Sequence, residues 1–175
     1  MINFLFDTKK NLFPIILILI LAFSRLIPHP PNFTPIIAVA IISGYLFKNI
    51  YFSLTVLLIS MLLSDFVIGF YKNMLFVYVP LFLITYLFFK ITKKINIKNL
   101  FLFSFLGAFI FYLVSNFGVW FTGSLYEKNL NGLVECYLLA IPFFKNTLFS
   151  TIFFSYSAFF ANHLYLIGKK SYFKN

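Results

Sequence analysis

The chain has 175 residues, of which 62% are apolar and 10% are charged, and its formal net charge is +10. Soluble domains are about half apolar and about a quarter charged, so this composition excludes an ordinary water-soluble domain. It predicts an all-α polytopic membrane protein that forms one integral membrane domain over residues 1–175 and has the lipid bilayer as a partner. The lysines lie in short clusters between apolar runs. Such clusters report membrane orientation, so nucleic acid is not expected as a partner.

Apolar runs predict six transmembrane helices, over residues 11–27, 34–48, 50–70, 74–92, 99–121 and 147–167. Pro14 is expected in the first turn of the first helix, where its missing N–H does no harm. Thr34 is expected to cap the second helix, with Pro35 at the first helical position.

Lysine and arginine positions predict the side of the membrane on which each connection lies. If the N-terminus is cytoplasmic, the cytoplasmic side receives Lys9, Lys10, Lys48, Lys90, Lys93, Lys94, Lys98, Lys169, Lys170 and Lys174, and the outer side receives Arg25, Lys72, Lys128 and Lys145. This asymmetry satisfies the positive-inside rule. We therefore expect a protein of the bacterial inner (cytoplasmic) membrane with both termini in the cytoplasm, and with residues 28–35, 64–73 and 116–146 outside.

The connection after the first predicted helix contains Pro28, Pro30 and Pro31. Prolines cannot continue a helix and they bias the preceding residue to extended backbone, so this connection is expected to be stiff. One interpretation is a rigid turn. The other is a fixed lid in which Asn32 and Thr34, together with the helix N-terminus behind them, bind a polar or anionic ligand group.

Asp65 is the only acidic residue inside an apolar run. An ionisable group at membrane depth is unfavourable unless it faces water, a partner or a ligand. Either Asp65 is a ligand-binding residue or it is an interfacial carboxylate near Gly69 and Lys72. Arg25, near the outer end of the first helix, is its expected ion-pair partner.

Asn116 and Trp120 lie four residues apart and share a helix face, which suits a clamp for a planar or heterocyclic ligand. The alternatives are an interhelical hydrogen bond for Asn116 and a place in the interfacial aromatic belt for Trp120.

Residues 121–146 carry too many polar side chains to span a membrane and are too many for a simple turn. A short helix on the outer surface, ended by Pro142, is expected here. Glu135, Tyr137 and Asn146 are its expected ligand contacts.

Motifs of enzymes and of metal sites are missing from the sequence, which has no H-E-x-x-H, G-x-S-x-G or Walker A pattern and only one cysteine, Cys136. Neither catalysis, a cofactor nor a metal site is expected. A proton-driven secondary transporter using Asp65 or His163 remains an alternative, although no inverted repeat is visible.

The segments "PPNFTPIIAVAIISGYLF", "LLISMLLSDFVIGF", "NFGVWFTGSLY" and "GLVECYLLAIPFFKNTLFS" resemble an uncharacterised bacterial family of short membrane transport proteins. That family is related to the substrate-binding S components of energy-coupling-factor (ECF) vitamin transporters. The resemblance covers about residues 20–160. It implies a six-helix S-component-like bundle that takes a solute from outside and occludes it under the loops after the first, third and fifth helices.

S components that dock on a shared energising module carry A-x-x-x-A on the first helix, whereas residues 11–27 have only Ala22 and Ser24. This difference puts an ECF-type energising module as a partner in doubt, and a solitary transporter, as in a cobalamin-linked group, stays open as the alternative. The expected function is capture of a small organic solute, a vitamin or a precursor such as cobalamin. The alternative is a non-transporting structural or assembly partner that docks through residues 121–146.

Overall fold

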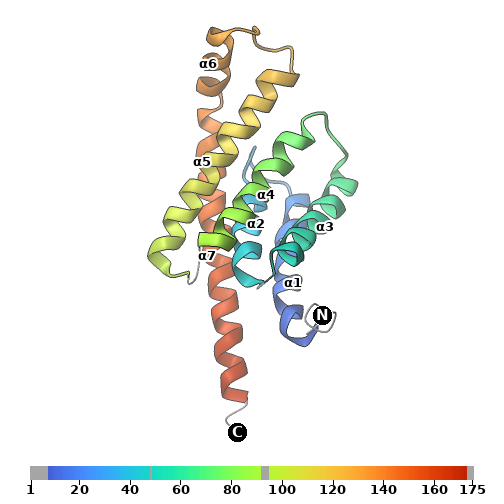
Figure 1. Ribbon diagram of the computed structural model, residues 1–175, viewed down its shortest axis with the longest axis vertical. Coiled ribbons are helices and arrows are strands. Elements are labelled where there is room, and N and C mark those ends of the chain that lie inside the picture. The colour runs from blue at the N-terminus through green and yellow to red at the C-terminus, as the bar shows by residue number, and fades with distance from the viewer. Residues whose placement is uncertain (1–7, 48, 92–94, 173–175) are drawn as a thin grey trace.

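The computed structural model describes residues 8–47, 49–91 and 95–172, in which helices alternate with short connections and no strand occurs. The elements are α1 (Thr8–Phe23), the 3-10 helix η2 (Ser24–Leu26), α2 (Ile36–Leu46), α3 (Ile50–Ile68), α4 (Met74–Ile91), α5 (Ile97–Thr122), α6 (Leu130–Leu139) and α7 (Ile141–Tyr172). Figure 1 shows that α1 begins and α7 ends toward one end of the bundle, while the connections at 27–35, 69–73 and 123–129 lie toward the other end. The predicted all-α fold class is confirmed.

Helix length separates the elements into two groups. Helices α3, α4 and α5 are long and apolar enough to cross a membrane, and α6 together with Ile141–Gly168, bent by 48°, makes a fourth candidate span. Shorter apolar helices cover Leu12–Leu26 and Ile36–Leu46. These helices indicate a membrane protein, with three or four candidate spans among the described residues where the sequence predicted six.

Three local expectations about helix ends are wrong. Pro14 lies inside α1, because that helix begins already at Thr8. The residue at the N-cap of α2 is Pro35, and no side chain caps this helix, so Thr34 is not the cap. Pro142 is the second residue of α7, where proline fits the first turn of a helix, and does not end the helix before it.

The second predicted span is a buried central helix. All residues of α2 from Ile36 to Gly44 are buried, and α2 packs against α1, α3, α4, α5 and α7. Its 11 residues extend about 16 Å, which is about half the roughly 30 Å hydrocarbon thickness of a bilayer. A helix that is apolar on every face suits complete enclosure. Here other helices enclose it.

A side-chain hydrogen bond joins α2 to α4. The hydroxyl of Thr85 donates to the carbonyl oxygen of Ala40 at 3.0 Å, and both residues are fully buried. We expect Thr85→Val to lower the free energy of unfolding by about 0.5–1.5 kcal/mol, because it removes this bond at nearly constant volume. Chemical unfolding of the detergent-purified protein measures the change. Thr55→Val, at an exposed position of α3, is the matched control, and equal effects of the two substitutions would contradict the assignment.

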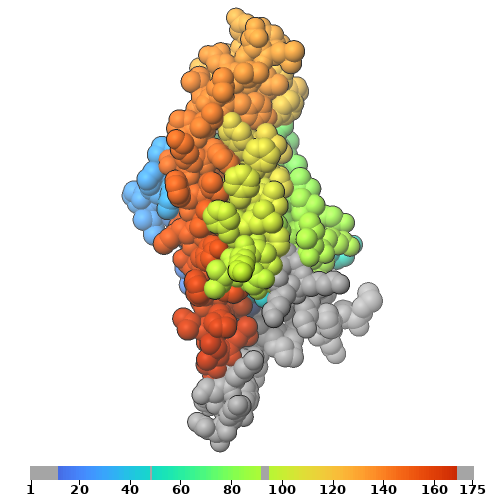
Figure 2. Space-filling model, turned by 90° about the vertical axis from the view of Figure 1, so that its left-hand side faces the viewer, coloured from blue at the N-terminus to red at the C-terminus, as the bar shows by residue number. Residues whose placement is uncertain are grey.

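Residues 112–140 form a second structural feature, which we call the α5–α6 lobe. Figure 2 shows α5 and α7 side by side along one face of the molecule, with α6 projecting at the top. Asn129 caps α6 by accepting a hydrogen bond from the Gly132 N–H at 2.9 Å. The ammonium of Lys128 donates to carbonyls at the end of α5, those of Trp120, Phe121 and Gly123. A lysine at a helix C-terminus satisfies carbonyls that lack helical partners.

Several lysines on which the orientation prediction depends lie outside the described residues. These are Lys48, Lys93, Lys94 and Lys174, together with the side chains of Lys9, Lys10, Lys169 and Lys170. Lys90 and Lys98 are described and exposed. The sidedness of the protein therefore stays a prediction.

Candidate functional site

A cavity of about 160 Å³ lies where the connections at 27–35 and 69–73 meet the helices. Its lining residues come from η2, residues 32 and 34, α2, residue 71, α4, α5 and α7, and they are Arg25, Asn32, Thr34, Ile36, Tyr71, Val77, Phe111 and Thr147. Five of the eight side chains are polar, while the remaining wall is aliphatic and aromatic. Pockets for drug-sized ligands measure roughly 300–1,000 Å³, so this cavity suits a smaller molecule.

An ion pair lies directly behind the cavity wall. Nη2 of Arg25 is 2.8 Å from Oδ1 of Asp65, and the two side chains are 10% and 0% exposed. The hydroxyl of Tyr78 donates to Oδ2 of Asp65 at 2.6 Å, while Oδ1 has no hydrogen bond in addition to the ion pair. Nη1 of Arg25 donates to Oγ of Ser64 at 2.6 Å. A buried charge pair needs such hydrogen bonds to offset its desolvation.

The turn at the end of α3 brings Tyr71 to the cavity wall, close to the ion pair that Asp65 forms. The carbonyl of Asp65 accepts the N–H of Gly69 at 2.7 Å, and Gly69 adopts a φ of 105°, a region that favours glycine. The chain turns there and returns to the cavity at Tyr71. Burial, with Asp65 as the second cause, raises the pKa of Tyr71 to about 12. Its hydroxyl therefore keeps its proton, and remains a donor, throughout the physiological pH range.

The proline segment, residues 28–35, contributes Asn32 and Thr34 to the cavity and contacts α7. The N–H of Phe33 donates to the carbonyl of Pro30 at 3.0 Å, and Asn32 takes a φ of 61°, which asparagine tolerates better than most residues. Nδ2 of Asn146 on α7 donates to the carbonyl of Pro31 at 2.9 Å. The ring of Phe33 packs against Phe153 and Phe154 of α7. The segment is thus attached to α7 by polar and aromatic contacts.

The structure divides the residues that the sequence singled out into two groups. Arg25, Asn32 and Thr34 line the cavity, Asp65 lies behind it, and Asn146 contacts the proline segment.

Asn116, Trp120, Glu135 and Tyr137 belong to the α5–α6 lobe instead. Nδ2 of Asn116 donates to the Tyr112 carbonyl of its own helix at 2.8 Å, and the indole N–H of Trp120 donates to the Glu127 carbonyl at 2.8 Å. The hydroxyl of Tyr137 donates to the Leu113 carbonyl at 2.7 Å, and the side chain of Glu135 is exposed. Trp120 and Tyr137 thus join the segments of the lobe, and none of these four side chains lines the cavity.

Sequence reasoning missed Tyr71, Tyr78 and Thr147. A tyrosine in the short connection after Asp65 was a usable signal, because that connection must lie near the carboxylate. Thr147 and Tyr78 carried no such signal, since isolated hydroxyls in apolar helices are usually packing residues that bond to their own backbone. Thr147 indeed donates to the Phe143 carbonyl at 2.9 Å.

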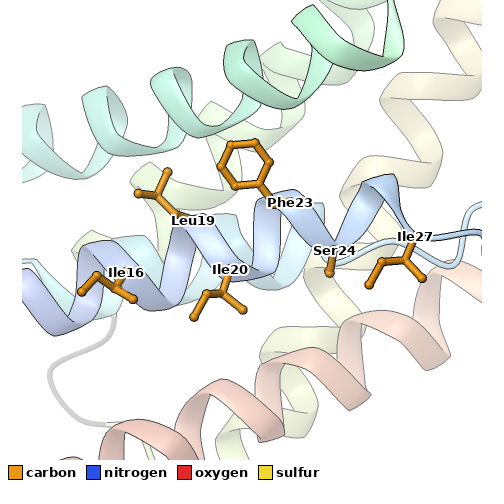
Figure 3. A pocket seen from close by; sticks show the side chains of 6 residues that line it. All are labelled: Ile16, Leu19, Ile20, Phe23, Ser24 and Ile27. Atoms are coloured by element: carbon orange, nitrogen blue, oxygen red, sulfur yellow. The ribbon is translucent and has the colours of Figure 1, made fainter.

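A larger hollow on the outside of α1 is a poorer candidate for a polar ligand. It measures about 430 Å³ and is lined by Ile16, Leu19, Ile20, Phe23, Ser24 and Ile27, whose side chains follow α1 and η2 (Figure 3). Its only polar side chain, Ser24, donates to the Leu21 carbonyl at 2.7 Å. An open apolar hollow on an apolar helix suits lipid chains.

Among the described residues, no group of three or more histidine, cysteine or acidic side chains could hold a metal ion.

Comparison with known proteins identifies a family for the chain but no activity. No curated protein and no solved structure matches the chain. The model of a protein family described as "Family of unknown function (DUF6580)" matches residues 6–173. The chain therefore belongs to this family of unknown function.

Proposed function

We propose that the protein captures a small polar solute in the cavity beneath the proline segment, as the binding step of its uptake across the bacterial inner membrane. The observation that supports this function best is the convergence of five polar side chains from separate segments on one small cavity, with a buried ion pair behind it. Binding sites typically combine an apolar wall with a few fixed polar groups. Val77, Phe111 and Ile36 provide such a wall.

The volume of the cavity limits the size of the solute that it can hold. A volume of about 160 Å³ is too small for a corrinoid, so we propose a compact vitamin, a precursor or another small metabolite in place of cobalamin. A bundle like that of the S components, with the proline segment as a fixed cover on the outer side, is part of this proposal.

A screen of small solutes tests the proposed function. Thermal unfolding of the detergent-purified protein is followed with nicotinate, nicotinamide, 4-aminobenzoate, β-alanine and pyridoxine. We expect a saturable rise in Tm with at least one solute, because a ligand at 100 times its Kd stabilises the folded state by about 2.7 kcal/mol. The rise should disappear in Asn32→Ala combined with Thr147→Val, which removes the polar groups of two side chains that line the cavity.

The matched control is Glu135→Gln, which changes an exposed side chain of the α5–α6 lobe and should keep the full response. Unchanged Tm with every solute, or a response that survives the double substitution, would contradict capture at this cavity.

The second function is docking of another membrane protein on the α5–α6 lobe. The observation that favours it is the exposure of large apolar side chains there, with Leu125 and Leu130 each 79% exposed. Exposed apolar patches of this kind often mark protein or membrane contacts. Crosslinking from Leu125 in intact membranes tests this function, and a lipid-only pattern would contradict it.

A further inference from the structure

The cavity wall offers hydrogen-bond donors and lacks an acid. Arg25, Asn32, Thr34 and Tyr71 all carry N–H or O–H groups, and none of the lining residues is aspartate or glutamate. Ile36, the first residue of α2, also lines the cavity, and no side chain caps that helix. An uncapped helix N-terminus presents free N–H groups and a positive partial charge. The wall as a whole therefore matches a negatively charged group.

A carboxylate matches this arrangement best among small organic anions. A guanidinium has five donors in a planar fork that fits a carboxylate with two parallel bonds. Arg25 is the only arginine of the chain, and it lies between the cavity and Asp65. Val77 and Phe111 leave room for a short apolar body attached to the carboxylate.

The net charge of the site bears on the protonation state of Asp65 when an anion is bound. The pair of Arg25 and Asp65 is neutral overall, so an arriving anion would leave one net negative charge beside two side chains that are only 10% and 0% exposed. Such a buried, unpaired charge is strongly unfavourable. We propose that the cavity takes a small monocarboxylate, and that Asp65 binds one proton as the ligand carboxylate takes over its ion pair with Arg25. This inference rests on the proposed function.

The step conserves charge and atoms. A proton from the aqueous phase forms a bond with Oδ1 of Asp65, the oxygen that has no hydrogen bond besides the ion pair, while Oδ2 keeps the hydrogen bond from Tyr78. The contact of Arg25 with Asp65 is replaced by a contact with the ligand carboxylate. The net charge of the site is zero before and after.

The other ionisable groups around Asp65 cannot take the proton in its place. Arg25 from η2, Tyr78 from α4 and Tyr71 from the connection at 69–73 are the ionisable groups facing it. The described side chains of α1, residues 12–23, include no ionisable group, and α2 has only Tyr45, near its other end. Arginine stays charged, and tyrosine hydroxyls titrate near pH 10 or above. Neither Arg25 nor these tyrosines can therefore take up the proton that the proposal requires.

Carboxylates and their neutral amides test the proposal. Calorimetric titration of the full chain in detergent uses acetate and acetamide, nicotinate and nicotinamide, and benzoate and benzamide, at pH 6, 7 and 8. Each titration is repeated in two buffers that differ in ionisation enthalpy, which gives the number of protons taken up. We expect at least one carboxylate to bind more than tenfold tighter than its amide, with one proton taken up per ligand. Its Kd should fall about tenfold for each unit decrease in pH, since binding is linked to one proton.

Asp65→Asn isolates the proton step. The amide imitates the protonated acid, so this variant should bind the same carboxylate with a Kd that does not change with pH, and without proton uptake. Glu135→Gln removes a different carboxylate and should keep the wild-type pH dependence. If Asp65→Asn does not fold, the proton count and the pH dependence of the wild-type protein decide the question.

The outcomes separate this inference from the proposed function. Amides that bind as tightly as carboxylates, or carboxylate binding without proton uptake, would overturn the inference. Binding of a neutral solute that is lost in Asn32→Ala combined with Thr147→Val would leave capture at the cavity intact. Absence of binding by every probe, to the wild-type protein and to Asp65→Asn alike, overturns the monocarboxylate site. If the solute screen is also negative, the proposed function fails with it.

Discussion

Asp65→Ala is expected to lower the free energy of unfolding by about 3–5 kcal/mol, because it leaves the guanidinium of Arg25 buried without its counter-ion. Arg25 is 10% exposed and lies 2.8 Å from Asp65. Its contacts with Ser64, Met61 and Tyr71 are with neutral side chains and cannot balance its charge. The substitution also removes the acceptor of the Tyr78 hydroxyl. Urea unfolding in mild detergent, followed by tryptophan fluorescence, measures the loss.

Two further variants distinguish a lost ion pair from general damage. Asp65→Leu combined with Arg25→Met removes both charges and should recover most of the stability, since apolar replacements of a whole buried pair are often neutral or stabilising. Glu135→Ala removes an exposed carboxylate and should stay within about 0.5 kcal/mol of the wild type. A double variant as unstable as Asp65→Ala alone would show that packing, and not charge, dominates at this position.

Gly44→Ala is expected to lower the free energy of unfolding by about 1–3 kcal/mol, although alanine is the better helix former. A Cβ atom at Gly44 would lie 2.6 Å from the backbone oxygen of Thr85 and 3.3 Å from the backbone nitrogen of Phe89. Backbone atoms of α4 cannot rotate away as a side chain would. The two helices must therefore separate, and this separation also lengthens the hydrogen bond between Thr85 and Ala40.

The control is Gly168→Ala in α7, where an added Cβ meets no atom within 4 Å. Removing a helical glycine from such an open position should leave stability unchanged or raise it by about 0.5–1 kcal/mol. Equal effects at positions 44 and 168 would mean that α2 and α4 are not packed as closely as described. Thermal unfolding of both variants under the same detergent conditions gives the comparison.

Hydrophobic patterning predicts where the helices of this protein are, but not which of them face lipid. A run of apolar residues has the same sequence signature whether lipid or other helices surround it. Residues 34–48 were therefore expected to span the membrane, whereas α2 is an 11-residue helix enclosed by its neighbours. Its shortness is visible in the sequence only as the distance between Pro35 and the polar pair Lys48 and Asn49.

Part of the site was predictable because charged residues are rare beside the apolar runs of this sequence. Arg25 and Asp65 are charged residues next to long apolar runs, so the sequence drew attention to them, and the structure places them in contact. Asn116 and Trp120 share a helix face as their spacing requires. Their side chains nevertheless bond to the carbonyl of Tyr112, one turn earlier in α5, and to that of Glu127, in the connection after α5. The spacing of Asn116 and Trp120 reveals neither acceptor, since side chains also bond to nearby backbone.

The enclosure of α2 also bears on how the chain is made. Ribosomes deliver α2 before α5 and α7, and both of these later helices contribute to the walls around α2. A helix of this length is poorly recognised as a span by the insertion machinery, which reads stretches of about 20 apolar residues. During synthesis, part of the surface of α2 therefore stays uncovered until α7 has been translated and packs against it. The enclosure of α2 is therefore completed only after translation of α7, and chains interrupted before α7 are predicted substrates for membrane proteases.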